Sequence, residues 1–181
     1  GGITSYVWEN TGGVDIGLSA LSGTIEDTNP DLSFPAVNPG ADAISTEITI
    51  YASFENGDTC TSASQTFTIT VNPEPQIDNF SETICEGDTF VSITPEDGTN
   101  GVVPLGTTYT WDIAANSSSS IEGASASTSA SATIPGSELT LVAGTTSPQD
   151  LIYVVTPTSS EGCEGEDFTV TITVNPTAQM N

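Results

Sequence analysis

The chain of 181 residues contains no lysine, no arginine and no histidine, although it carries 24 aspartate and glutamate residues. Its formal net charge at pH 7 is therefore -24. Charged residues of both signs normally make up about a quarter of a globular chain, so a complete lack of basic side chains indicates selection.

The missing basic side chains exclude several classes of protein. Nucleic-acid binding needs Lys or Arg against the phosphates. Ser/His/Asp and Cys/His catalysis need an imidazole base, and phosphoryl transfer usually needs a cationic clamp. Carboxylate-pair chemistry, as in glycoside hydrolysis, needs no basic side chain and is not excluded. However, no two carboxylates in the sequence form a recognisable catalytic pair. We therefore expect neither an enzyme nor a nucleic-acid partner.

Long apolar runs are also missing, because no stretch approaches the 18 or so residues that a membrane-spanning helix needs. Hydrophobic residues make up 35% of the chain and charged residues only 13%. Ser, Thr, Gly and Asn fill much of the remainder, which is typical of a threonine-rich β-protein. The first residues do not form a signal peptide, so we expect an internal part of a longer protein.

An internal repeat is present. The segment TSYVWEN resembles TTYTWDI, and TFTITVNP resembles TVTITVNP. Three pairs of landmarks share an offset of 103 positions, namely Trp8 and Trp111, Cys60 and Cys163, and Pro73 and Pro176. This offset predicts a tandem duplication, with a complete domain at residues 76–181 and a preceding domain at residues 1–75 that lacks its N-terminal part.

Each unit has the pattern of an all-β domain. The clearest strands are predicted at residues 47–54, 66–71 and 169–174, where apolar residues alternate with polar ones. Weaker patterns predict strands at residues 4–8, 90–93, 107–113, 139–142 and 151–155, with a loop or edge strand in the serine-rich residues 117–132. Short strands in a unit of about 100 residues favour a two-sheet sandwich of immunoglobulin type.

The second unit resembles a known family. It contains C-x-G-D-x-F at residues 85–90, ITP-x-DGTNGVVP at 93–104, TTYTW at 107–111, and GC ahead of a last strand that ends in TVNP. These motifs together resemble the PKD-like repeat of giant Bacteroidota surface proteins, which include gliding-motility adhesins of the SprB type secreted by the type IX system. The resemblance implies an immunoglobulin-like sandwich that serves as a repeated spacer or adhesive module, outside the cell and without catalytic activity.

The cysteines allow a disulfide in such an oxidising exterior. Cys85 is near the start of the complete unit and Cys163 is near its last hairpin, so we expect a bridge between them. Cys60 corresponds to Cys163, and its partner would precede Gly1. The alternative is that all three residues are small buried thiols.

The acidic clusters are weak candidates for calcium binding. Loop carboxylates beside glycine can supply the oxygen ligands that calcium needs. The candidates are Glu96, Asp97, Glu164, Glu166 and Asp167. No EF-hand loop or nonapeptide repeat is present, so a solvated acidic surface is the simpler interpretation, and no other cofactor is expected.

Trp8 and Trp111 each follow a tyrosine by two positions in a predicted strand. An aromatic face could stack on a sugar, but this pattern fits a core tryptophan of a sandwich better. We therefore expect both side chains in the core.

Taken together, the sequence favours a non-enzymatic repeat segment of a secreted, filamentous cell-surface adhesin. Such a segment would act as a stalk and as a multivalent contact with surfaces, and gliding motility is one process in which it could take part. Its expected partners are neighbouring repeats and extracellular surfaces or polysaccharide. Two alternatives stay open, a carbohydrate-binding module of a surface protein and a passive spacer beside an enzyme domain.

Overall fold

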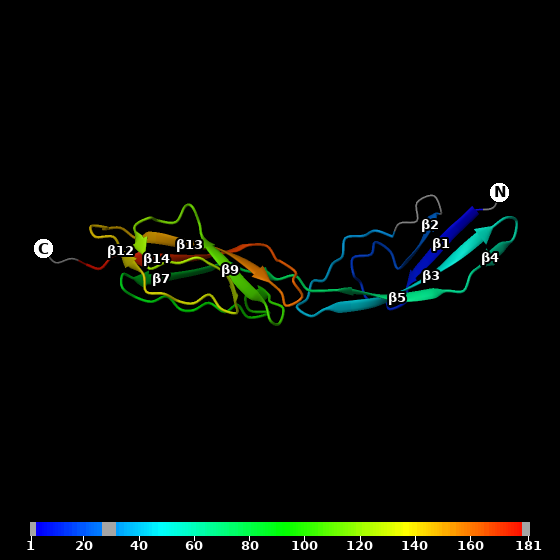
Figure 1. The fold of residues 1–181 in the computed structure, drawn as a ribbon, viewed down its shortest axis with the longest axis horizontal. Coiled ribbons are helices and arrows are strands. Elements are labelled where there is room, and N and C mark those ends of the chain that lie inside the picture. The colour runs from blue at the N-terminus through cyan, green and yellow to red at the C-terminus, as the bar shows by residue number, and fades with distance from the viewer. Residues whose placement is uncertain (1–2, 27–31, 179–181) are drawn as a thin grey trace. The chain divides into compact units, whose positions relative to one another are not determined.

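The computed structural model describes residues 3–26 and 32–178, and this part of the chain contains strands and no helix (Figure 1). The all-β prediction is confirmed. The chain divides into two compact units, Gly1–Pro73 and Glu74–Asn181. No helix in the described residues is long and apolar enough to cross a membrane.

The described residues of unit 1 (Gly1–Pro73) form a five-stranded sheet. Its strands are β1 (Ile3–Asn10), β2 (Ser22–Glu26), β3 (Ile44–Glu55), β4 (Thr59–Thr61) and β5 (Gln65–Val71). β1 lies between β2 and β3, and β3 pairs with both β4 and β5 along its length, all antiparallel. Among the described residues, β5 therefore has a paired neighbour on one side only.

Trp8 anchors the small core of unit 1 together with Ile16 and Ile48. The indole lies directly over Gly23 on the neighbouring strand β2, where Trp8 and Gly23 are opposite each other. A Cβ atom at position 23 would lie 2.7 Å from the indole Nε1. Glycine is needed here because any side chain would displace the tryptophan.

Unit 2 (Glu74–Asn181) contains a larger sheet in the order β11-β9-β13-β14-β7 and two short two-stranded ribbons, β6-β8 and β10-β12. The strands of the sheet are β7 (Phe80–Cys85), β9 (Thr108–Ile113), β11 (Ser127–Ser131), β13 (Gln149–Thr158) and β14 (Phe168–Asn175). Those of the ribbons are β6 (Gln76–Ile77), β8 (Gly101–Val102), β10 (Ile121–Glu122) and β12 (Thr140–Leu141).

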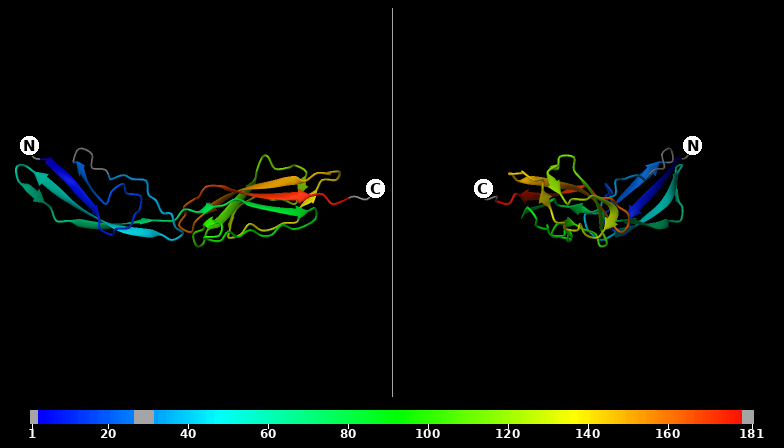
Figure 2. Two further views of the ribbon diagram at one scale, coloured as in Figure 1. Left: turned by 180° about the vertical axis from the view of Figure 1, so that it is seen from behind. Right: turned by 60° about the vertical axis from the view of Figure 1, so that its left-hand side comes forward.

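The edge strand β7 runs parallel to β14, whereas the other pairs in this sheet are antiparallel (Figure 2). Its register puts Phe80 opposite Val170 and Ile84 opposite Val174. The polypeptide between β7 and β9 passes over the inner face of the sheet and adds Phe90 to the core, 1% exposed. β7 and Phe90 thus close one side of the sandwich.

The core of unit 2 lies between this sheet and a second, irregular layer. The sheet contributes alternate side chains of β13 and β14, including Tyr153, Val170 and Ile172, which are at most 2% exposed. The second layer contributes Phe90, Ile134, Leu139 and Leu141. The ring centroids of Phe90 and Tyr153 are 6.3 Å apart, which places the two layers in direct contact.

The second layer is less regular than the sequence predicted. Residues 90–93 do not form a ladder, since this segment is held only by isolated bridges from Thr89 and Ile93. The strand predicted at residues 139–142 is reduced to the two residues of β12. Pro95 and Pro135 follow the bridged Ile93 and Ile134 closely, and proline has no N–H with which to continue a ladder.

Candidate functional site

The aromatic side chains of unit 2 belong to its interior. Trp111 is 8% exposed, and its indole Nε1 donates a hydrogen bond to the Ser125 carbonyl at 2.9 Å. Tyr109 packs edge-on against Phe168, with the ring centroids 6.1 Å apart. Burial raises the pKa of Tyr109 to about 12, so this phenol stays neutral and does not act as an acid or base at physiological pH.

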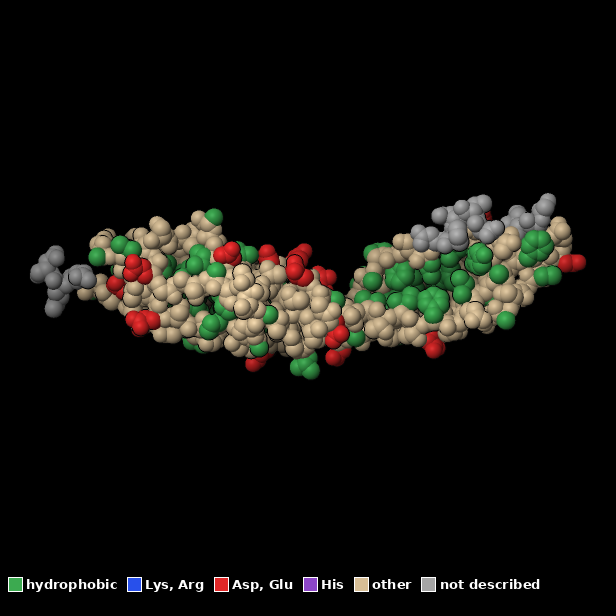
Figure 3. All heavy atoms as spheres, in the orientation of Figure 1, with side chains coloured by type: hydrophobic (Ala, Val, Ile, Leu, Met, Phe, Trp, Pro, Cys, Tyr) green, Lys and Arg blue, Asp and Glu red, His purple; other side chains and the backbone are tan. Residues whose placement is uncertain are grey.

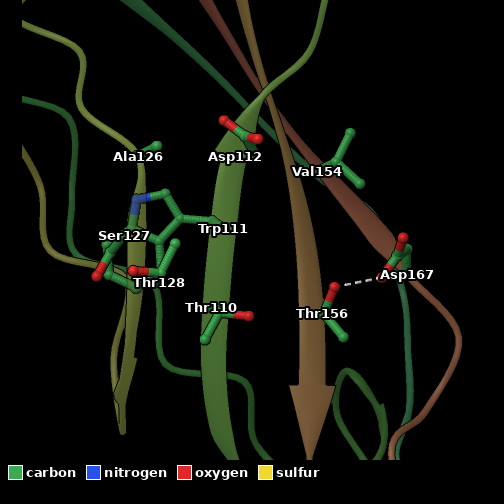
Figure 4. A pocket seen from close by; sticks show the side chains of 9 residues that line it. All are labelled: Thr110, Trp111, Asp112, Ala126, Ser127, Thr128, Val154, Thr156 and Asp167. Carbon is green, nitrogen blue, oxygen red and sulfur yellow. Dashed lines mark hydrogen bonds between the residues drawn. The ribbon is translucent and has the colours of Figure 1, made fainter.

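A shallow hollow of about 360 Å³ lies on the outer side of the sheet beside Trp111. Figure 4 shows its hydroxyl and carboxylate groups along β9 and β13 and the indole turned toward β11. The hydroxyl of Thr156 donates to Asp167 at 2.6 Å. Trp111 offers little ring surface at this hollow, because its side chain is buried. The hollow therefore offers polar groups but no aromatic platform.

The predicted Cys85–Cys163 disulfide is wrong for this structure, in which Cys60, Cys85 and Cys163 are all free. Cys85 lies opposite Asn175 at the end of β14, whereas Cys163 precedes the start of that strand at Phe168. An eight-residue strand is roughly 25 Å long, and a disulfide requires Cα atoms within about 7 Å. The parallel pairing of β7, which the sequence did not indicate, separates the two thiols.

The acidic candidates do not form a shared calcium site. Asp97 accepts a hydrogen bond from the backbone N–H of Val103 at 2.9 Å, and Asp167 is engaged by Thr156. Within residues 3–26 and 32–178, no group of three or more Asp, Glu, Cys or His side chains is arranged to hold a metal ion. Glu96 and Asp97, and likewise Glu164, Glu166 and Asp167, are therefore not gathered into such a group of carboxylates.

A second hollow, of about 570 Å³, lies at the β6-β8 ribbon. Its walls include Glu74, Asp78, Glu166 and Asp167. The sequence did not single out Glu74 or Asp78, because they are about 90 positions from the other two carboxylates and only the sandwich brings them near. This hollow is an acidic part of the surface with no basic group to complement it.

In the described residues we find no nucleophile placed beside a basic side chain that could activate it. Histidine and lysine are absent from the whole chain, and the three free cysteines have no imidazole to activate them. Both hollows are open. The one beside Trp111 is lined mainly by threonine, serine and two aspartates, and the one at the β6-β8 ribbon by four carboxylates with Gln76 and Asn79, so neither pairs a hydroxyl or thiol nucleophile with an imidazole or amine base. The geometry fits a structural or contact-forming module.

The fold of unit 2, a β-sandwich built on a five-stranded sheet, is immunoglobulin-like. The PKD-like domain family matches residues 82–178, which is more than half of the chain, and the chain therefore belongs to this family. No curated protein matches it. PKD-like domains are generally non-catalytic and typically extracellular.

Proposed function

We propose that this chain is a non-enzymatic repeat segment of a secreted, filamentous cell-surface adhesin attached to the outer membrane. Units of this type would follow one another in a stalk and would touch extracellular surfaces or polysaccharide through many weak contacts. Type IX secretion and a role in gliding motility form part of the same proposal, since both accompany the resemblance of its motifs to the repeats of such adhesins.

The observation that carries the proposal is a strand framework shared by the two units. In each unit a central strand pairs with a tryptophan-bearing strand on one side and with the last threonine-rich strand on the other. The corresponding pairs are Trp8–Ile50 and Trp111–Val155 in the first ladder, and Ile48–Phe67 and Tyr153–Val170 in the second. Cross-strand pairs at corresponding positions of the two units, separated by a nearly constant sequence offset, support a tandem repeat.

The surface chemistry supports weak contacts in large number. Neither hollow is enclosed, and all charge on the surface is negative. Linked weak sites can raise the overall affinity by roughly 10²–10⁴ without any single strong site. Like charge along an array also keeps neighbouring fibres apart.

The decisive experiment compares the single chain with the same chain displayed in many copies on a particle. We expect retention on polysaccharide-coated or bare surfaces only for the multivalent form. The control particle carries an unrelated acidic immunoglobulin-like domain at the same density. Equal retention of the control particle, or saturable binding of the single chain to one glycan on an array, would contradict the proposal.

A carbohydrate-binding module is the second candidate, and the hollow beside Trp111 is the feature that favours it. Thr110, Asp112 and Thr156 present hydroxyl and carboxylate groups there that could bind sugar hydroxyls. If the single chain binds a glycan, the variants Asp112→Asn and Thr156→Val should abolish that binding. Loss of binding in both variants would favour this candidate over the stalk.

A further inference from the structure

Unit 1 exposes apolar side chains that unit 2 buries at the matching places. In β5, Phe67 is 45% exposed, and Ile69 and Val71 are half-buried. In β14, the residues 103 positions later are Val170, Ile172 and Val174, and each is 0% exposed. Figure 3 shows a patch of apolar side chains on the visible surface of unit 1. We refer to Phe67, Ile69 and Val71 with the unpaired side of β5 as the β5 acceptor face.

In unit 2 the face that corresponds to the β5 acceptor face is covered by another strand, β7, which serves as a template for unit 1. There β7 lies along the side of β14 that corresponds to the unpaired side of β5, and it runs parallel to β14. Phe80 and Ile84 of β7 join the core cluster, and the polypeptide that follows brings in Phe90. The described residues of unit 1 contain no counterpart of β7 or of Phe90, because β1 corresponds to β9.

We propose that the β5 acceptor face binds a β7-type strand, supplied by a copy of the segment 76–103 on the N-terminal side of Gly1 in the same polypeptide. This inference rests on the repeat organisation proposed above. The strand would lie parallel to β5, and the template gives its register: a phenylalanine opposite Phe67 and an isoleucine opposite Val71, as Phe80 and Ile84 lie opposite Val170 and Val174.

The chemistry of the face favours a polypeptide strand over other occupants. Its unpaired backbone N–H and C=O groups are spaced as in a β-ladder, and an extended chain matches that spacing. The side chains Phe67, Ile69 and Val71 require apolar groups at alternate positions. A segment with the pattern of β7 meets both requirements.

The test adds a synthetic peptide of residues 76–95, with Cys85→Ser, to the whole 181-residue chain. We expect saturable one-to-one binding by calorimetry, together with slower hydrogen exchange of the β5 amides and unchanged exchange in β14. In a second arm, residues 76–103 are fused directly ahead of Gly1. We expect the fusion to raise the melting temperature of unit 1 by about 10 °C, to stay monomeric and to lose peptide binding.

Matched controls distinguish peptide binding at the β5 acceptor face from nonspecific hydrophobic binding. The variant Ile69→Asp places a charge on the acceptor face and should abolish peptide binding, whereas Thr68→Asp on the opposite side of β5 should keep it. A peptide carrying Phe80→Ser and Ile84→Ser should not bind.

The proposal would be overturned if millimolar peptide did not slow hydrogen exchange of the β5 amides and the fusion did not raise the melting temperature of unit 1. Protection of β5 in a dimer of the chain without peptide would overturn it as well, because a second copy would then be the occupant. Neither result bears on surface retention by the multivalent particle, so failure of this inference is distinguishable from failure of the proposed function.

Discussion

Single carboxylates in this protein are stabilised by hydroxyl and backbone donors, since no cation is available. Asp150 accepts a hydrogen bond from the Thr173 hydroxyl at 2.7 Å, and Asp167 accepts one from Thr156 at 2.6 Å. Such bonds satisfy the carboxylate oxygens but leave the negative charge unneutralised.

Tyr109 gives the protein a specific sensitivity to alkali. Its pKa in the folded protein is about 12 against 10 for a free tyrosine, because burial disfavours the phenolate. The stability that this difference represents is complete below pH 10 and is lost as the pH rises toward 12, where the unfolded chain ionises first. We expect Tyr109→Phe to move the alkaline unfolding midpoint of unit 2 to higher pH.

This shift is measured by Trp111 emission in a Trp8→Phe background, with intact Tyr109 in the same background as the reference. Tyr153, whose pKa burial also raises, keeps part of the pH dependence in the variant. An unchanged midpoint in Tyr109→Phe would show that ionisation of Tyr109 does not drive the unfolding.

For whole strands, neighbours decide how much a given sequence contributes to stability. β5 and β14 share the segment TITV, yet Ile172 in β14 is 0% exposed and Ile69 in β5 is half-buried. β14 is flanked by β13 and β7, whereas β5 is paired only with β3 among the described strands. Equal local propensity therefore yields unequal burial, and burial dominates the energetics.

The substitutions Ile172→Ala and Ile69→Ala test this difference with identical chemistry. We expect Ile172→Ala to lower the free energy of unfolding of unit 2 by about 2–5 kcal/mol, because it opens a cavity in a closed core. Ile69→Ala should cost unit 1 about 1 kcal/mol or less, since solvent already reaches that site.

Urea unfolding gives both values, with Trp111 as the reporter for unit 2 and Trp8 as the reporter for unit 1, each in a background that lacks the other tryptophan. Thr171→Ala and Thr68→Ala, on the opposite sides of the same strands, serve as controls. Equal losses at Ile172 and Ile69 would contradict the difference in burial.

For the molecule as a whole, charge of one sign is the dominant electrostatic fact. All 24 acidic side chains repel one another, and no basic side chain offsets them. Compaction increases this repulsion, so the folded state is destabilised at low ionic strength. Salt shortens the screening length from about 30 Å at 0.01 M to about 3 Å at 1 M, which relieves the repulsion.

We therefore expect the melting temperature to rise by about 5 °C or more between 0.01 M and 1 M NaCl. Calcium and magnesium at equal ionic strength should raise it equally, because no described group of side chains forms a specific metal site. A triple variant of Glu161, Glu164 and Glu166 to Gln should show a smaller salt effect. A clear excess of calcium over magnesium would contradict this expectation.

The regular strands could be predicted, whereas the layer facing them and the sites could not. Alternating residues in 66–71 and 169–174 specify a strand locally, and β5 and β14 formed there. Phe90 and Ile134 lie in segments whose conformation depends on packing against the sheet, so local pattern failed for them. The disulfide prediction failed because sequence position does not reveal that β7 runs parallel to β14.

The sequence by itself determined the charge, the all-β class and the spacing of the repeated landmarks, since these depend on residue type and local periodicity. Tertiary structure alone decided which of two similar strands is covered, because burial depends on neighbours that are distant in the chain. It therefore left the thiols of unit 2 apart, closed the core around Tyr109 and Ile172, and left Phe67 of β5 exposed and Ile69 only half-buried.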